Sequence, residues 1–171
     1  LLTKSYIYDN YHVEFGTNQI HEALVIVAHN NTFNPVTRYL DSLTWDCENR
    51  LEIWLTDHAC AEDNEYVRAV SAKAVVAAVA RAYDPGCKYD TMLVLEGEQG
   101  IGKSSLIAAL VPDNEWFSDT ELNIGHKDAF QQLQGIWIQE MGEMAGATKS
   151  DIKSLKAFLS SKSDNFRSAY A

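Results

Sequence analysis

The sequence predicts an α/β fold with a parallel-sheet core, preceded by a mainly helical N-terminal region. From Tyr89 onward, apolar strand-like runs alternate with helical patterns, an order typical of a parallel sheet. Residues 1–86 instead show helical spacing and helix start signals over most of their length. A glycine-rich loop at residues 97–104 connects the first strand-like run to a helix. We therefore expect two parts, a helical region at 1–86 and an α/β core at 87–171.

Capping residues and apolar spacing predict the individual elements. Asn34 and Pro35 mark a helix start, with Asn as the cap and Pro at the first helical position. Asp63 is expected to cap the longest helix, in which valines among alanines indicate burial on most faces. The helical region is expected to contain a short strand or arm within 1–18 and helices at 20–29, 34–43, 50–58 and 63–82. The core is expected to contain strands near 91–96, 115–118 and 136–140 and helices near 103–110, 127–134 and 149–161.

The loop Gly-Glu-Gln-Gly-Ile-Gly-Lys-Ser at 97–104 fits the phosphate-binding pattern G-x-x-x-x-G-K-[ST] at every required position. Glycines let the backbone curl so that N–H groups point at phosphate oxygens, and the following helix adds a partial positive charge at its N-terminus. Lys103 is expected to reach the β- and γ-phosphates of ATP, and the Ser104 hydroxyl to ligate Mg²⁺. The fold class is therefore a P-loop NTPase. The expected nucleotide-binding residues are Gly97, Glu98, Gln99, Gly100, Ile101, Gly102, Lys103, Ser104 and Ser105.

Hydrolysis also requires a carboxylate at the metal and a residue that positions the attacking water. Residues 136–140, Ile-Trp-Ile-Gln-Glu, form an apolar run that ends in an acid. Glu140 at the carboxyl end of a strand is expected to emerge at the same sheet edge as the loop. We assign Glu140 to the Mg²⁺ side and Glu143 to water activation. The reverse assignment of the two roles stays open, and solvent-exposed loop carboxylates remain the alternative for both. The predicted catalytic residues are Lys103, Glu140 and Glu143.

Charge is unevenly distributed along the 171 residues. The net charge of −10 argues against a general nucleic-acid-binding surface. Residues 149–167 nevertheless carry five basic and two acidic side chains, whereas residues 1–148 carry 9 basic and 22 acidic side chains. This distribution fits a protein that touches a phosphate backbone at one place only, although a solvated helix face is the commoner explanation for a charge run.

The basic segment combines a helix with an extended stretch. The candidate contacts to single-stranded DNA are Lys149, Lys153 and Lys156 on one helical face and Arg167 in the extended stretch. Cations suit a nucleic-acid backbone and aromatic rings suit bases. Core packing remains the commoner role for the aromatic side chains of this segment, Phe158, Phe166 and Tyr170.

Composition excludes several classes of protein. Hydrophobic residues make up 46% of the chain, as in a folded protein, and no apolar run approaches the length of a membrane span. The three cysteines, Cys47, Cys60 and Cys87, lack metal-binding spacing, so we expect reduced thiols in the cytoplasm. The chain starts at Leu1 without a signal peptide, and we expect it to be a piece of a longer protein.

Several segments together resemble the virulence-associated protein E family of phage and prophage proteins, which are related to superfamily 3 helicases. The matching segments are residues 34–46, 84–90, 95–104, 135–143 and 156–170. The resemblance implies an ATP-driven motor in mobile-element DNA replication in a bacterial host, often joined to a primase and assembled as a homo-oligomeric ring. It implies that the segment 156–170 contacts single-stranded DNA in the central channel. It also implies that a sensor Asn and an arginine finger follow residue 171, so that this core is C-terminally incomplete.

Two other functions remain open. The domain can be a non-catalytic nucleotide-binding switch that recruits replication or defence proteins. A small-molecule kinase is disfavoured, because a kinase lid carries several arginines and Arg167 is the only arginine after Arg81. We expect ATP and Mg²⁺ as cofactors, single-stranded DNA as a partner, and no membrane association.

Overall fold

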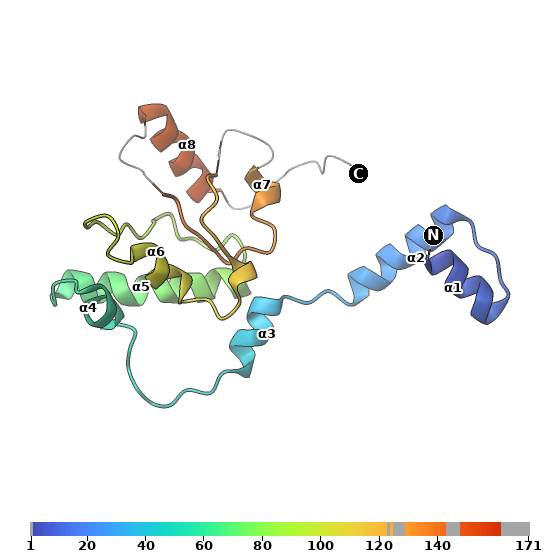
Figure 1. Ribbon diagram of the computed structural model, residues 1–171, viewed down its shortest axis with the longest axis horizontal. Helices are drawn as coiled ribbons and strands as arrows, with labels where there is room; N and C mark the ends of the chain where they lie inside the picture. The colour runs from blue at the N-terminus through green and yellow to red at the C-terminus, as the bar shows by residue number, and fades with distance from the viewer. Residues whose placement is uncertain (1, 123, 125–128, 143–147, 162–171) are drawn as a thin grey trace. The chain divides into compact units, whose positions relative to one another are not determined.

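The computed structural model describes residues 2–122, 124, 129–142 and 148–161. The chain divides into two compact units, Leu1–Asp41 and Ser42–Ala171. Figure 1 shows the helices along the chain. The predicted division into residues 1–86 and 87–171 rests on the change of sequence pattern and stays a prediction.

The first unit contains helices α1 (Leu2–Tyr11) and α2 (Thr17–Asn30), which contact each other. The strand or arm expected within residues 1–18 is wrong, because α1 occupies most of this segment. The alternation on which it rested spans only three residues, and a helix satisfies its backbone hydrogen bonds locally without a strand partner. Local side-chain bonds accompany α1, such as the amide of Asn10, which donates to the carbonyl of Tyr6 at 2.8 Å.

Helix α3 (Pro35–Ser42) begins as the sequence predicts. The Asn34 side chain accepts hydrogen bonds from the backbone N–H groups of Val36 at 2.9 Å and Thr37 at 3.4 Å. Pro35 occupies the first helical position, where a missing N–H has no cost. Here short-range chemistry alone fixes the start of the helix.

In the second unit, the short helix α4 (Trp54–Ala59) packs on the long helix α5 (Glu65–Tyr83). Trp54 and Leu55 of α4 are buried, with 7% and 4% of their surface exposed. The Trp54 indole donates to the backbone carbonyl of Ser71 in α5 at 3.0 Å. Burial of the indole with its N–H satisfied makes this contact the centre of the α4–α5 packing.

Two expectations for α5 need correction. The cap is Asn64, whose side chain accepts from the N–H of Val67 at 2.9 Å, whereas Asp63 pairs with Arg68. An acid next to an available arginine forms the stronger, charge-assisted bonds and leaves the capping position to the neighbouring amide. Burial on most faces is also wrong, since Val76 is 53% exposed.

The remaining elements of the second unit are short. They are α6 (Lys103–Ala108), the 3-10 turn η1 (Asn114–Trp116), β1 (Phe117–Ser118), α7 (Ala129–Gln132), β2 (Ile138–Gln139) and α8 (Lys149–Leu159). Strands β1 and β2 pair in parallel, with Phe117 opposite Ile138 and Ser118 opposite Gln139. The Trp137 indole donates to the carbonyl of Ala78 at 2.9 Å and so joins the start of β2 to α5.

The described residues therefore form a mixed, largely helical structure with a two-stranded parallel sheet, smaller than the sheet that the sequence predicts. Residues 91–96 are described and form no strand, so the strand expected there is wrong. The apolar composition of this segment is typical of a strand, but a strand also needs ladder hydrogen bonds to a neighbour. Val94 is 59% exposed, which a buried central strand would not allow.

We predict that Trp54→Ala lowers the free energy of unfolding by about 3 to 5 kcal/mol, because it leaves a cavity beside α5 and removes the bond to Ser71. Urea unfolding of the full-length protein measures this loss. Trp45→Ala is the control, since Trp45 is 72% exposed, and it should change the stability by less than about 1 kcal/mol. Equal losses in the two variants would contradict the packing described for α4 and α5.

Candidate functional site

The glycine-rich loop turns sharply into α6. Gly100 and Gly102 have φ angles of 83° and 90°, in the left-handed region that favours glycine. Gly102 lies directly before Lys103, the first residue of α6. The two glycines are therefore required by the backbone conformation as well as by the sequence pattern.

The Lys103 side chain folds back over this loop. Its ammonium group donates hydrogen bonds to the backbone carbonyls of Gly97 at 2.9 Å and Glu98 at 2.7 Å. A lysine ammonium has three donors and no acceptor, so these two carbonyls hold a positive charge at the centre of the loop. This arrangement can attract an anion.

The structure brings Ser104 and Glu140 together although they are 36 residues apart. The Ser104 hydroxyl donates to Oε1 of Glu140 at 2.6 Å. Parallel pairing positions the acid, because Glu140 directly follows β2 and its backbone N–H donates to the carbonyl of Ser118 in β1 at 2.8 Å. The carboxyl end of the sheet and the N-terminus of α6 therefore meet at one point, as open α/β sheets arrange their ligand sites.

The second carboxylate oxygen of Glu140 is buried and has no hydrogen-bond partner among the described residues. A buried polar atom of this kind is costly unless it is paired, so it marks a place where a donor or a cation belongs. Oxygen ligands from a hydroxyl and a carboxylate are those that Mg²⁺ prefers. The residues present therefore fit a magnesium ion beside Ser104 and Glu140.

Sequence reasoning missed Gln139 as a part of this arrangement. Its side-chain amide donates to the carbonyl of Thr120 at 2.9 Å and to the carbonyl of Glu140 at 2.8 Å. Gln139 thus ties the segment after β1 to the acid after β2. The available signal was a polar residue directly before the acid that ends the run 136–140.

Not all predicted site residues can be placed. Glu143 and Arg167 lie outside the described residues. Glu98, Gln99, Ile101 and Ser105 are exposed along the loop and the start of α6. The acid proposed to activate water therefore stays a prediction from sequence.

The lysines of α8 are exposed. The ammonium groups of Lys149, Lys153 and Lys156 form no hydrogen bond or ion pair within the described ranges, whereas Leu155 on the same helix is 6% exposed. Phe158 packs against Phe130 of α7 with ring centroids 5.9 Å apart, as the core alternative for this aromatic residue predicts. The helix therefore has one side that packs and a row of cations that does not.

A capping box starts this helix. The Thr148 hydroxyl and backbone N–H donate to the Asp151 carboxylate at 2.7 and 2.8 Å, and the Asp151 N–H donates to the hydroxyl oxygen at 3.3 Å. These bonds lower the pKa of Asp151, with the hydroxyl bond contributing most. The capping box therefore stabilises the first turn of the helix that carries the lysines.

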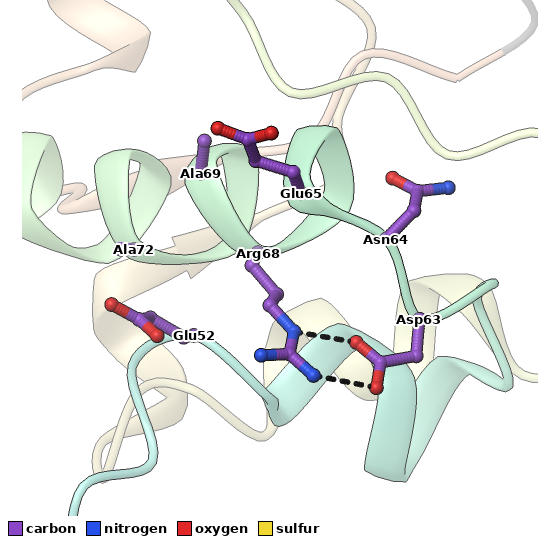
Figure 2. Close-up of a pocket in the computed structure, with 7 residues that line it drawn as sticks. All are labelled: Glu52, Asp63, Asn64, Glu65, Arg68, Ala69 and Ala72. Carbon is purple, nitrogen blue, oxygen red and sulfur yellow. Dashed lines mark hydrogen bonds and ion pairs between the residues drawn. The ribbon is translucent and has the colours of Figure 1, made fainter.

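A separate pocket of about 490 Å³ lies at the start of α5 (Figure 2). It is lined by Glu52, Asp63, Asn64, Glu65, Arg68, Ala69 and Ala72. Arg68 spans its edge with two bonds to Asp63, and the bond from the guanidinium lowers the pKa of that carboxyl. None of the predicted site residues lines this pocket, and exposed charges paired in this way are ordinary surface chemistry.

Fold and site together define a mixed α/β protein in which a glycine-rich, lysine-containing loop meets a strand-end acid. Residues 40–171 match the family model of the virulence-associated protein E-like domain, and the chain belongs to this family. A comparison with curated proteins finds no match. Within the part of the chain that the structure describes, no helix has the length and apolar character needed to cross a membrane.

We predict that Gly102→Ala destabilises the protein by about 1 to 2 kcal/mol, because alanine is strained at a φ of 90° although no atom lies within 4 Å of the added methyl group. Chemical denaturation measures the change. Gly142→Ala is the matched control, because Gly142 also has open space around it but no positive φ. A Gly102 variant as stable as this control would show that the loop does not hold its left-handed turn.

Proposed function

We propose that this domain binds ATP and Mg²⁺ at the loop 97–104 and hydrolyses ATP as the motor part of a phage or mobile-element DNA replication helicase. The observation that carries the proposal is the bond between the hydroxyl of Ser104 and the carboxylate of Glu140. A loop serine and a strand-end acid at hydrogen-bond distance are the pair that holds the metal in P-loop NTPases. Membership in the virulence-associated protein E-like family supports the same reading.

Each residue has a distinct role in this proposal. When ATP binds, the Lys103 ammonium leaves the carbonyls of Gly97 and Glu98 and contacts the β- and γ-phosphates. Ser104 and Glu140 hold the magnesium ion. The ion neutralises negative charge on the phosphates. Glu143, three residues after Glu140, orients the attacking water. The N–H groups of the loop and of the first turn of α6 contact the phosphate oxygens.

Single-stranded DNA is the proposed partner. The exposed lysines of α8 provide a local positive charge on an otherwise acidic chain. A single domain with a few phosphate contacts binds weakly, so we propose that the full-length protein forms a ring in which several α8 helices contact one strand. A primase, fused or separate, is the proposed replication partner.

The proposal predicts that Lys103→Ala and Glu140→Gln separate binding from hydrolysis. Lys103→Ala removes the charge that faces the phosphates and should abolish tight ATP binding in isothermal titration. Glu140→Gln keeps the loop lysine and should bind ATP while turnover of the full-length protein falls about 100-fold or more.

Lys73→Ala and Glu121→Gln are matched controls, because both residues are exposed and lie outside the site. Both controls should bind and hydrolyse ATP normally. Unchanged ATP affinity in Lys103→Ala would refute the nucleotide site. ATP binding without turnover in the unaltered full-length protein would favour the nucleotide-binding switch over the motor.

The proposal also predicts that reversing two charges on α8 weakens DNA binding. Lys153→Glu with Lys156→Glu should lower the affinity of the full-length protein for single-stranded DNA by about 10-fold or more at low salt, and the loss should shrink as salt rises. Fluorescence anisotropy with a labelled oligonucleotide measures both effects. Lys4→Glu with Lys73→Glu reverses two charges elsewhere and should leave the affinity within about 3-fold. Equal effects of the two double variants would show that the α8 lysines are only solvated.

A further inference from the structure

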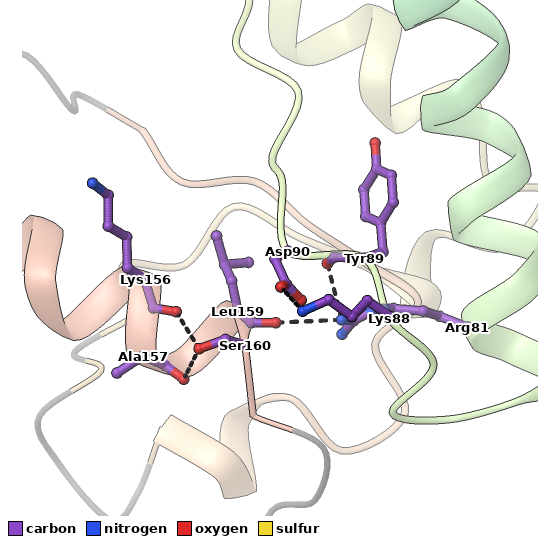
Figure 3. A network of polar contacts seen from close by, with 8 residues as sticks. All are labelled: Arg81, Lys88, Tyr89, Asp90, Lys156, Ala157, Leu159 and Ser160. Atoms are coloured by element: carbon purple, nitrogen blue, oxygen red, sulfur yellow. Dashed lines mark hydrogen bonds and ion pairs between the residues drawn. The ribbon is translucent and has the colours of Figure 1, made fainter.

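Arg81 connects three segments of the second unit (Figure 3). It lies in the last turn of α5, and its guanidinium donates from Nη2 to the backbone carbonyls of Tyr89 at 3.0 Å and Leu159 at 3.4 Å. Tyr89 belongs to the segment that leads into the glycine-rich loop, and Leu159 is the last residue of α8. One side chain therefore bridges the approach to the proposed nucleotide site and the helix that carries the exposed lysines.

The partners of this cation are carbonyls instead of carboxylates. The nearby acid Asp90 pairs with Lys88, and Arg81 forms no ion pair among the described residues. Its Nε is buried and has no hydrogen-bond partner there. Of its two acceptors, the Leu159 carbonyl lies at the C-terminal end of α8, where backbone carbonyls concentrate partial negative charge. Bonds to neutral carbonyls are weaker than a bidentate carboxylate pair, so this bridge can be broken and remade.

This bridge supplies a hydrogen bond at the C-terminus of α8. The Ser160 hydroxyl donates to the carbonyls of Lys156 and Ala157, and the N–H of Ser161 donates to that of Phe158. Within the described part of the chain, the carbonyl of Leu159 accepts its hydrogen bond from Arg81. The last turn of α8, which contains Lys156, is therefore bonded to α5 through Arg81 as well as packed on α7 through Phe158.

We infer that Arg81 is a positioning residue that transmits nucleotide binding to the cationic helix α8. The inference rests on the proposed function. Lys103 holds the carbonyls of Gly97 and Glu98, and ATP would draw it away from them. The segment between Gly97 and Tyr89 is short, and Arg81 anchors it at Tyr89. A change of the loop at Gly97 therefore reaches the Arg81 bridge, and through Leu159 the last turn of α8.

The test compares Arg81→Gln, Arg81→Lys and the control Lys73→Gln, which removes an exposed cation from the same helix, in the full-length protein. Amide hydrogen exchange of residues 156–161 is measured with and without a slowly hydrolysed ATP analogue. Affinity for a single-stranded oligonucleotide is measured under the same two conditions. Without nucleotide, Arg81→Gln should speed exchange in this turn about 10-fold, whereas Lys73→Gln should match the unaltered protein.

In the unaltered protein the analogue should change exchange in this turn and change the DNA affinity about 5-fold or more, and Arg81→Gln should abolish both responses while still binding the analogue. Arg81→Lys keeps the charge but not the planar set of guanidinium donors, so it should retain a part of each response. If Arg81→Gln does not fold, Arg81→Lys replaces it in the comparison. Responses that persist in both Arg81 variants would overturn the inference and leave the proposed function intact. Failure of the unaltered protein to bind the analogue would instead overturn the proposed function, and the inference with it.

Discussion

Two tryptophan indoles bonded to backbone carbonyls of α5 are the constraint on which the second unit depends. Trp54 donates to the carbonyl of Ser71, and Trp137 donates to that of Ala78. These acceptors are seven residues apart and therefore share one face of the helix. The first contact fixes α4, on which α6 packs, and the second fixes the start of β2. Both sides of the candidate site are thus positioned from a single helix.

The site itself arises where two short pieces of structure meet. Parallel pairing of β1 with β2 places Glu140 at the carboxyl end of the sheet, and the left-handed turn at Gly102 starts α6 so that Ser104 faces the acid. Neither residue is buried deeply, yet one oxygen of Glu140 lies buried and unpartnered among the described residues. A buried acceptor without a hydrogen-bond partner is the physical reason to expect a cation or a donor at this position.

Predictions from sequence succeeded where the decisive interaction is local. Asn34 caps α3 through bonds to residues two and three positions ahead, which the sequence displays directly. They failed where a competing neighbour or a distant partner decides. Asp63 resembled a cap, but Arg68 engages it and Asn64 caps α5. Residues 91–96 had the composition of a buried strand, but composition cannot supply the neighbouring strand that a ladder requires.

The sequence by itself determined the glycine-rich loop, the start of α3 and the family to which the chain belongs, because these depend on residue types at fixed short spacings. Tertiary structure decided the contact of Ser104 with Glu140, the tie made by Gln139 and the bridge of Arg81 to Leu159. Each joins residues that are 19 to 78 positions apart. The strand-end position of Glu140 predicted that it would share a sheet edge with the loop, but the contacts themselves follow from how helices and strands pack.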